Sequence, residues 1–397
     1  MNPAGSRVAG TIPKPILGGP LSRIFLLLPA LCTAGTAIGA AASTATLATP
    51  AATMNTGLET AWMPYALWLA PLAAGAAFLG TWAMRRVALR TGHIDHPHER
   101  GSHTRPTPVG GGMGFVVPVT LAWVGIALAW GDYVLLTTAI VSAALAVMGY
   151  IDDRHRIEPW IRLTAQAAAA AAIAILILWR ARGAQGIEYA GYIAGAAFML
   201  TWSANLFNFM DGIDGLCSTE CLYIALGGLA VSAFTGGSTP FLLALVVLSA
   251  ALVGFLPWNA PPAKIFMGDG GSTWLGFTLA ALAIQDAVRL PGLLSGWLIL
   301  PALFVADATV CVIRRAYRGE NITQAHRAHA YQNLSRLLRS HGKVVATFVG
   351  VNMLLLPAVY VALEMPAYRW IATIVAYAVA VTLVIVARSG VHGVGEA

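Results

Sequence analysis

Apolar runs long enough to cross a bilayer recur along almost the whole of this 397-residue chain. A hydrocarbon core of about 30 Å needs about 20 apolar residues in a helix, and a helix satisfies all of its own backbone groups there. Apolar residues make up 58% of the chain and charged residues 10%, which excludes an ordinary soluble domain. The sequence therefore predicts an all-α, polytopic integral membrane protein of about 11–12 transmembrane helices.

We expect the spans at residues 24–46, 62–84, 112–131, 133–150, 163–180, 189–206, 216–235, 239–256, 271–288, 293–312, 345–363 and 368–387. They suggest three parts: an N-terminal extension with one extra helix (1–60), a catalytic membrane domain (61–345), and C-terminal helices of that same domain (346–397). Small residues at 40–43 are compatible with signal cleavage. The first span is long for a signal peptide, however, and this favours an uncleaved helix.

The basic residues lie almost entirely on one side of this predicted topology. The five loops after the spans ending near 84, 150, 206, 256 and 312 hold sixteen Arg and Lys residues, whereas the alternate loops hold four. By the positive-inside rule the first set faces the cytoplasm. Every polar cluster lies in that set. We therefore expect a cytoplasmic active site, with membrane lipid and no nucleic acid as the partner of a chain whose net charge is +7.

The densest polar cluster runs from Asn205 to Leu216 and contains two amides and two carboxylates, Asn205, Asn208, Asp211 and Asp214. Charged groups near a bilayer are costly, and hard oxygen donors suit Mg²⁺, which takes one or two protein carboxylates plus phosphate oxygens from a substrate. The two acids lie three residues apart, as do the two amides, which predicts that each pair shares a helical face. A helix cap explains one or two of these residues but not all four. We interpret the stretch as half of a metal-dependent phosphate site.

Two other acidic motifs lie at predicted helix ends on the same side. Asp152 and Asp153 repel each other, so their ionisation needs a cation, part of which Arg154 and Arg156 supply, and one of the acids is a candidate general base. A simple helix-end ion pair is the alternative. Asp269 lies among glycines where a span begins, a place that favours anions or metal-bound phosphates, with plain helix capping as the alternative.

Basic and histidine residues in three loops are candidates for substrate binding. Arg100, His103 and Arg105 lie in a Pro- and Gly-rich loop and can donate to phosphate, although a rigid basic surface loop explains them as well. If the stretch after 324 is helical, His326 and His329 share a face and can bind phosphate or sugar oxygens, with an ordinary surface helix as the alternative. A further candidate is Lys264.

In their order, these motifs resemble the polyprenyl-phosphate N-acetylhexosamine-1-phosphate transferases, also called glycosyltransferase family 4, over residues 62–345. Asp152-Asp153 resembles the paired-Asp motif, residues 205–216 the N-x-x-N-x-x-D-G-x-D-G-L signature, and residues 268–272 the G-D-x-x-S element. The H-x-x-H-x-Y-Q pattern at 326–332 is similar to the bacterial O-antigen initiating branch. Where the family commonly has Arg before its glycine run, this chain has Val109, and Arg105 is the nearest substitute.

The resemblance implies transfer of a sugar 1-phosphate from a UDP-N-acetylsugar to undecaprenyl phosphate with release of UMP and with Mg²⁺, or alternatively Mn²⁺, as cofactor. It implies that Asp269 binds the metal together with Asn208 or Asp211. One of Asp152 and Asp153 would activate or position the acceptor phosphate. The residues implied to contact the substrates are Asn205, Asp214, Arg100, His103, Arg105, Lys264, His326 and His329.

Such an enzyme would work in the bacterial inner membrane and initiate O-antigen or other cell-envelope polysaccharide synthesis. Within the family, UDP-GlcNAc or UDP-MurNAc-pentapeptide is the alternative donor, and a homodimer is one open assembly. A membrane transporter is the alternative from another class. It requires ionisable residues near the bilayer midplane, for which Asp286 and Asp307 are the candidates, and a buried acid of this kind is expected to have a partner.

Overall fold

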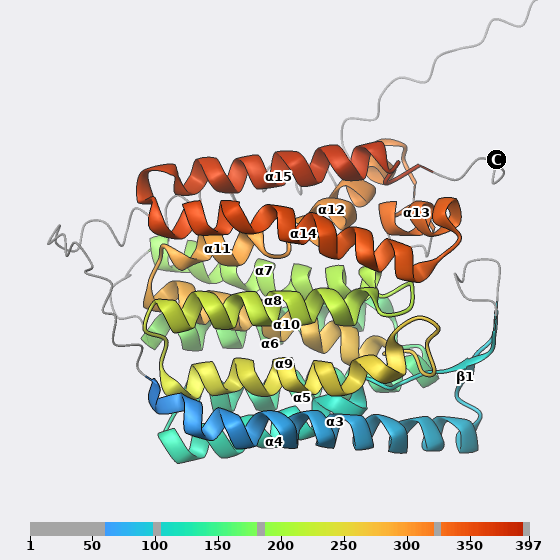
Figure 1. Ribbon diagram of the computed structural model, residues 1–397, viewed down its shortest axis with the longest axis horizontal. Coiled ribbons are helices and arrows are strands. Elements are labelled where there is room, and N and C mark those ends of the chain that lie inside the picture. The colour runs from blue at the N-terminus through green and yellow to red at the C-terminus, as the bar shows by residue number, and fades with distance from the viewer. Residues whose placement is uncertain (1–59, 98–104, 181–186, 321–326, 392–397) are drawn as a thin grey trace, which may run out of the picture. The chain divides into compact units, whose positions relative to one another are not determined.

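The computed structural model describes residues 60–97, 105–180, 187–320 and 327–391, all within one compact unit, Ala48–Ala397. The described chain is almost entirely helical, as predicted, and its long helices run side by side (Figure 1). The helices are α3 (Met63–Thr91), α4 (Met113–Trp130), α5 (Tyr133–His155), α6 (Pro159–Arg180), α7 (Ile187–Met210), α8 (Leu216–Phe234), α9 (Thr239–Asn259), α10 (Asp269–Arg289), α11 (Leu293–Ile299), α12 (Ala302–Tyr317), α13 (Ala330–Leu338), α14 (His341–Glu364) and α15 (Arg369–Val386), with 3-10 turns at Thr60–Trp62 and Pro366–Tyr368.

Nine of the described helices are long and apolar enough to cross a membrane, and the bent pair of α11 and α12 makes a tenth. The expected span at 24–46 lies outside the described residues, and each of the others corresponds to a helix. The span expected at 293–312 is broken, because the chain bends by 65° beside Pro301, which has no N–H to continue the helix. Helix α10 is not among these nine, although nearly all of its side chains are buried within the protein.

Helix α10 positions the site, because nearly all of its side chains are buried and it packs against both α5 and α7. Small residues allow this close approach. A Cβ on Gly149 of α5 would lie 2.7 Å from the carbonyl oxygen of Asp269, and a Cβ on Gly276 of α10 would lie 2.3 Å from that of Ser203 on α7. Small-residue contacts of this kind are the usual means of holding helices together in membranes. They bring the first turn of α10 against the end of α5.

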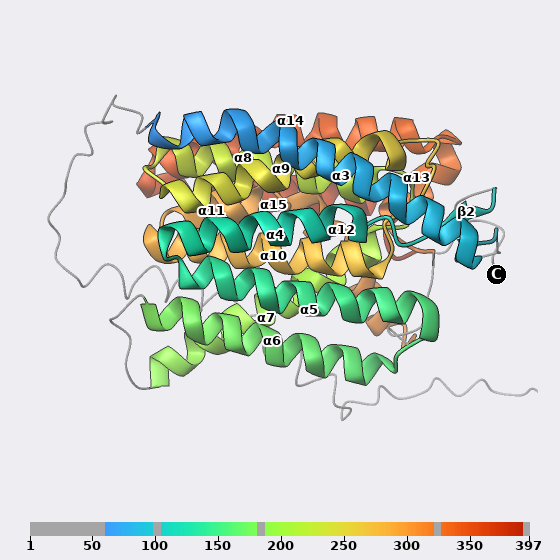
Figure 2. The same ribbon diagram turned by 90° about the horizontal axis from the view of Figure 1, so that it is seen from below.

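Two short strands that the sequence analysis did not predict, β1 (Ile94–Asp95) and β2 (Thr107–Pro108), pair antiparallel. They lie at the same end of the helices as α13 (Figures 1 and 2). The glycine run follows β2, and the N–H of Gly112 donates to the carbonyl oxygen of Met267 at 2.9 Å. A Cβ on Gly112 would lie 2.5 Å from the Cα of Gly271. The absence of side chains on these glycines admits the backbone around the start of α10.

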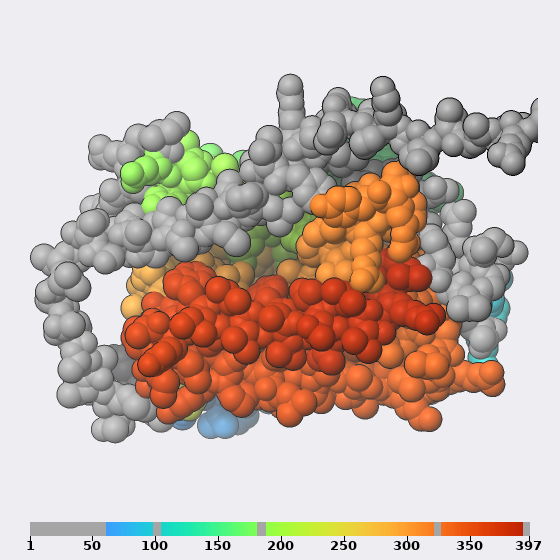
Figure 3. All heavy atoms as spheres, turned by 90° about the horizontal axis from the view of Figure 1, so that it is seen from above, coloured from blue at the N-terminus to red at the C-terminus, as the bar shows by residue number. Residues whose placement is uncertain are grey.

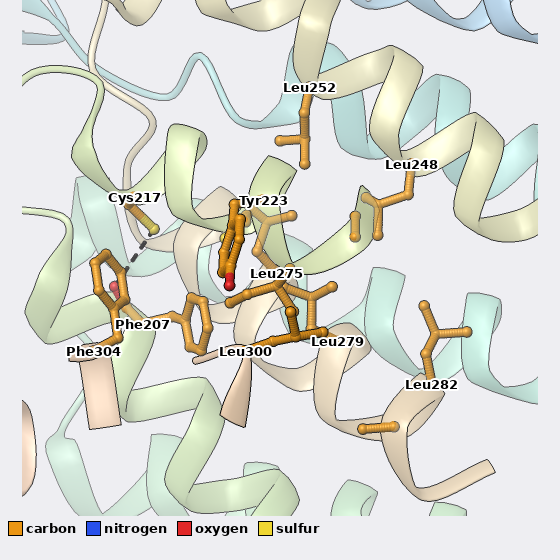
Figure 4. Close-up of a cluster of buried hydrophobic side chains, with 14 of the residues drawn as sticks. Phe207, Cys217, Tyr223, Leu248, Leu252, Leu275, Leu279, Leu282, Leu300 and Phe304 are labelled. Carbon is orange, nitrogen blue, oxygen red and sulfur yellow. Dashed lines mark hydrogen bonds between the residues drawn. The ribbon is translucent and has the colours of Figure 1, made fainter. Parts of the chain in front are cut away.

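At the C-terminal side of the fold, α15 packs along α12 and α14, and Figure 3 shows it covering this face. Deeper in the protein, hydrophobic side chains from α7, α8, α9, α10 and α12 form one buried cluster (Figure 4). The rings of Phe207 and Phe304 lie 5.6 Å apart there, and the Cys217 Sγ lies 3.8 Å from the carbonyl oxygen of Phe207. This packing fixes the last turn of α7, which carries Asn208.

Candidate active site

Arg162, on the first turn of α6, binds acidic residues from two other helices. Its Nη1 donates to Asp152 Oδ2 at the end of α5 and lies 3.0 Å from Asp269 Oδ2 at the start of α10. The other oxygen of Asp152 accepts the backbone N–H of Ile157. Arg162 is therefore the cation that binds Asp152 of the acidic pair, and it also contacts Asp269. The expectation for Arg154 is wrong, because its guanidinium lies over the Tyr150 ring at 4.1 Å.

Asp153 caps the N-terminus of α10. Both of its carboxylate oxygens accept the backbone N–H of Asp269, at 3.0 and 3.1 Å. This confirms that a helix begins at Asp269, where the exposed N–H groups and the helix dipole favour negative charge. The approach requires Gly268, which has φ +80° and whose Cβ would lie 2.5 Å from Asp153 Oδ2. Two acids from distant parts of the sequence thus meet directly.

The two amides of α7 have different partners. The Nδ2 of Asn208 donates to Asp269 Oδ1 at 2.8 Å and to Ser272 Oγ at 3.2 Å, so Asn208 joins the acidic cluster. One turn earlier, the Nδ2 of Asn205 donates to Gln166 Oε1 at 2.6 Å. Asn205 is thus held toward α6, beside the cluster rather than within its hydrogen bonds.

Asp211 and Asp214 do not share a helical face, and this expectation is wrong. α7 ends at Met210 and α8 begins at Leu216, so both acids lie in the turn between them, which Gly215 closes with φ +74°. Burial raises the pKa of Asp211 well above the ordinary value, and the nearby carboxylates of Asp269, Asp153 and Asp214 raise that pKa further. The turn therefore carries Asp211 toward the cluster.

Asp214 points toward two other segments. Its Oδ2 accepts the N–H of Ala263, in the segment before α10, at 3.0 Å and lies 3.3 Å from His341 Nδ1 at the start of α14. Lys264 is turned away, since its ammonium donates to the Pro257 carbonyl oxygen at 3.1 Å.

The residues of the first loop and of the histidine pair are described only in part. Arg105 is exposed, and among the described residues its side chain forms no hydrogen bond or ion pair with the acidic cluster. Arg100, His103 and His326 lie outside the described residues.

His329 is buried, with 3% of its surface exposed, and it precedes α13 as an extended N-cap residue. The expectation that it lies on a helical face is therefore wrong. Burial opposes its charge, but the neighbouring Asp307, whose Oδ1 lies 3.7 Å from its Nδ1, and Cys311 outweigh burial and raise the pKa of His329 to about 9. Asp307, in turn, accepts the N–H groups of Ala330 and Tyr331, at 2.7 and 3.1 Å. Asp307 and His329 together anchor the start of α13.

The site is thus an acidic cluster at one end of the helices, formed by Asp152, Asp153, Asp211 and Asp269 and neutralised in part by Arg162. No three Asp, Glu, His or Cys side chains among the described residues are placed to hold a metal alone. Mg²⁺ needs only one or two protein carboxylates when substrate phosphates complete its shell, and the oxygen donors here fit that requirement. Fold and site together define a polytopic membrane protein with an acidic cluster at the ends of its helices.

Comparison with known proteins agrees with this class. Residues 134–286, which run from α5 to α10 and include the whole acidic cluster, match the model of glycosyl transferase family 4. The chain is 31% identical over 311 residues to the decaprenyl-phosphate N-acetylglucosaminephosphotransferase of Mycobacterium tuberculosis, which covers 69% of this chain and 76% of that relative. The chain belongs to glycosyl transferase family 4, within the polyprenyl-phosphate hexosamine-1-phosphate transferases.

Two other relatives extend the comparison. A probable undecaprenyl-phosphate N-acetylglucosaminyl 1-phosphate transferase of Bacillus subtilis is 28% identical over 277 residues, 65% of this chain and 74% of the relative. A phospho-N-acetylmuramoyl-pentapeptide-transferase of Picosynechococcus is 32% identical over 280 residues, 63% of this chain and 72% of the relative. The relatives thus differ in the sugar and in the polyprenyl chain that their names state.

The sequence analysis missed Arg162 and Gln166 as site residues. Both lie on α6, which begins at Pro159, four residues before the expected start of that span. Arg162 was assigned to a loop for this reason. The available sequence signal was a glutamine, Gln166, inside an apolar run, with an arginine one helical turn before it. In the structure Gln166 is buried, with 2% of its surface exposed.

Proposed function

We propose that this protein transfers an N-acetylhexosamine 1-phosphate from a UDP-sugar to a polyprenyl phosphate, with undecaprenyl phosphate as the expected acceptor. A phosphate oxygen of the acceptor attacks the β-phosphorus of the donor, the bond from that phosphorus to the bridging oxygen breaks, and UMP leaves with that oxygen. The single observation that carries the proposal is the convergence of Asp153, Asn208 and Asp269 from three helices. Family membership and the names of the relatives support it.

In this reaction, Asp269 would hold Mg²⁺ or Mn²⁺, together with Asn208 or Asp211. When bound, the ion would neutralise charge between the two phosphate-bearing substrates, a contribution of several kcal/mol in metal-assisted phosphate chemistry. The donor set fits in its chemistry, because carboxylate and amide oxygens are ligands that suit Mg²⁺ and substrate phosphates would complete its shell.

The remaining roles follow from hydrogen-bonding capacity. Asp152 is held by the Arg162 guanidinium and the Ile157 N–H, whereas the contacts of Asp153 are with backbone N–H groups at the start of α10. Asp153 is thus the better candidate to orient or deprotonate the acceptor phosphate. Arg162 is placed to exchange its carboxylate partners for substrate phosphate, since guanidinium groups bind both anions.

The sidedness of the charges supports a cytoplasmic active site in a bacterial inner membrane. The acidic cluster lies at the helix ends whose loops carry most of the arginines, and the positive-inside rule puts those loops in the cytoplasm. A polyprenyl phosphate keeps its phosphate at the headgroup plane, where a cytoplasmic nucleotide can reach it. The product would initiate O-antigen or another cell-envelope polysaccharide.

The two acids named as candidates for a transporter, Asp286 and Asp307, offer no support for one. Asp286 accepts hydrogen bonds from Trp297 Nε1, at 2.9 Å, and from the Ser232 hydroxyl, and it forms an ion pair with Arg289 at 2.9 Å. Asp307 holds the start of α13. Both are used in structural contacts.

The test is to incubate the purified protein with undecaprenyl or decaprenyl phosphate and each of a panel of UDP-N-acetylsugars, including UDP-GlcNAc and UDP-MurNAc-pentapeptide. The proposal expects UMP release that requires both the acceptor and a divalent ion. Absence of UMP with every donor and both acceptors would contradict it. The sugar that gives the highest kcat/KM identifies the branch.

A further inference from the structure

The chain turns inward directly after α15 and is buried beneath α13. Ser389, which has no exposed surface, donates its hydroxyl to Asp307 Oδ1 at 2.6 Å. The next residue, Gly390, has φ +74° and donates its N–H to the Ala328 carbonyl oxygen at 2.5 Å. A Cβ on Gly390 would lie 2.8 Å from the Cβ of Arg314, so both its conformation and its space require glycine.

Three side chains bind the carbonyl oxygens of this segment, residues 388–390. Arg314 Nη1 on α12 donates to the carbonyl of residue 389 at 2.7 Å, and Arg318 Nη1 donates to that of residue 390 at 2.6 Å. Asn333 Nδ2, on α13, donates to that of residue 388 at 2.7 Å. Every carbonyl in the segment therefore has a side-chain donor, which holds the backbone after α15 in one position.

The same contacts continue to the acidic site. Asp307, which binds Ser389, also accepts the N–H of Tyr331 at 3.1 Å. The Tyr331 hydroxyl donates to the Phe209 carbonyl oxygen at 3.0 Å, and a Cβ on Gly212 would lie 2.1 Å from that hydroxyl. Tyr331 thus presses against the turn between α7 and α8. A continuous series of buried contacts joins the end of α15 to the turn that follows Asn208.

We propose that residues 388–390 are a positioning element of the active site, acting through Asp307 and Tyr331 on the end of α7, which carries Asn208, and on the turn after it, which carries Asp211. The inference rests on the proposed function. Without the Ser389 hydroxyl, Asp307 loses a buried donor and the start of α13 is free to shift. Because a displacement of about 1 Å in an active site can cost up to about a hundredfold in rate, we expect a fall of about tenfold in kcat.

The test compares Ser389→Ala with Ser232→Ala. Ser232 is also fully buried and also donates its hydroxyl to a buried aspartate, Asp286. Asp286 lies seventeen residues along α10 from Asp269, about 26 Å at the rise of a helix. Ser389→Ala should lower kcat about tenfold and change the donor KM less than about twofold, whereas Ser232→Ala should leave kcat within about twofold.

Tyr331→Phe keeps the ring and removes only the bond to Phe209, and it should lower kcat to a similar extent. If the two residues act in series, the double variant of Ser389→Ala and Tyr331→Phe falls short of the product of the single effects. Equal kcat in Ser389→Ala and Ser232→Ala, or fully multiplicative effects in the double variant, would overturn the proposal. Should Ser389→Ala not fold, Arg314→Met serves as the second variant. It removes the hydrogen bond from the partly exposed Arg314 to the carbonyl oxygen of residue 389, and the same outcomes decide.

Amide hydrogen exchange of residues 205–216 gives a readout that does not depend on activity. Exchange there should become faster in Ser389→Ala and stay unchanged in Ser232→Ala. If the wild-type protein transfers no sugar phosphate but the two variants still differ in exchange in this way, the proposed function fails. The structural link from residues 388–390 to residues 205–216 then still stands. Unchanged exchange in Ser389→Ala contradicts the link itself.

Discussion

Replacement of Arg162 tests the electrostatics of the site. Its Nη1 contacts Asp152 and lies 3.0 Å from Asp269 Oδ2, so Arg162→Met leaves two carboxylates without their cation. At that distance and an effective dielectric constant of about 20, one such pair has a Coulomb energy of about 5 kcal/mol. The Arg162 and Asp269 side chains are 24% and 32% exposed, so solvent screening reduces the net effect to about 1–2 kcal/mol, or about one pH unit.

The sign of the effect follows from the loss of a positive charge. Burial raises the pKa of Asp269 and Arg162 lowers it, so without Arg162 ionisation of Asp269 becomes harder and its pKa rises. The acidic limb of the kcat/KM profile for UMP release should therefore move to higher pH by about one unit, and activity should fall more at pH 6 than at pH 8. Arg162→Lys keeps the positive charge, so the acidic limb of its profile should lie close to that of the wild type. Arg156→Met, at an exposed arginine of the same end, is the control. An unmoved limb in Arg162→Met, or an equal shift in the control, would refute the reasoning.

Three further predictions concern stability. Gly149→Ala places a Cβ 2.7 Å from the Asp269 carbonyl oxygen and should lower the free energy of unfolding by about 1–3 kcal/mol in detergent, whereas Gly125→Ala, with nothing within 4 Å, should not. Asp153→Asn weakens the cap on α10 and should cost about 1 kcal/mol in the same assay; no loss would contradict the capping role. Because the pKa of Asp211 is raised in the folded protein, Asp211 favours the folded state at acid pH, and this stability is lost as the pH rises through that pKa. Without divalent ions, Tm should therefore fall as the pH rises, and the fall should be smaller in Asp211→Asn. Parallel curves of Tm against pH for the two proteins would contradict this prediction.

Most of the helices could be predicted from the sequence, because a membrane leaves an apolar run few alternatives to a helix. The same argument located the acidic motifs at helix ends and on one side. The same argument failed at two helix ends, because the length of an apolar run does not determine them. α6 starts earlier than its apolar run, at Pro159, so Arg162 went unnoticed, and the break at Pro301 separates α11 from α12.

Local periodicity was the least reliable guide to the site. The three-residue spacing of Asp211 and Asp214 suggested a helical face, but α7 ends before Asp211. His329 looked like an exposed ligand, and only long-range packing against Asp307 reveals its burial. The contact between Asp153 and the Asp269 N–H joins residues more than a hundred positions apart, which no local pattern can specify.

The central claim is that Asp269 stands where acidic residues from separate helices bind the divalent ion used in sugar-phosphate transfer. The most direct measurement is a Mg²⁺ titration of UMP release for the wild-type protein, Asp269→Asn and Glu158→Gln, an exposed carboxylate at the same end of the helices. We expect Asp269→Asn to show no Mg²⁺-dependent release at any concentration while remaining folded in detergent, and Glu158→Gln to match the wild type. Mg²⁺-dependent release of UMP by Asp269→Asn at the wild-type rate would contradict the account.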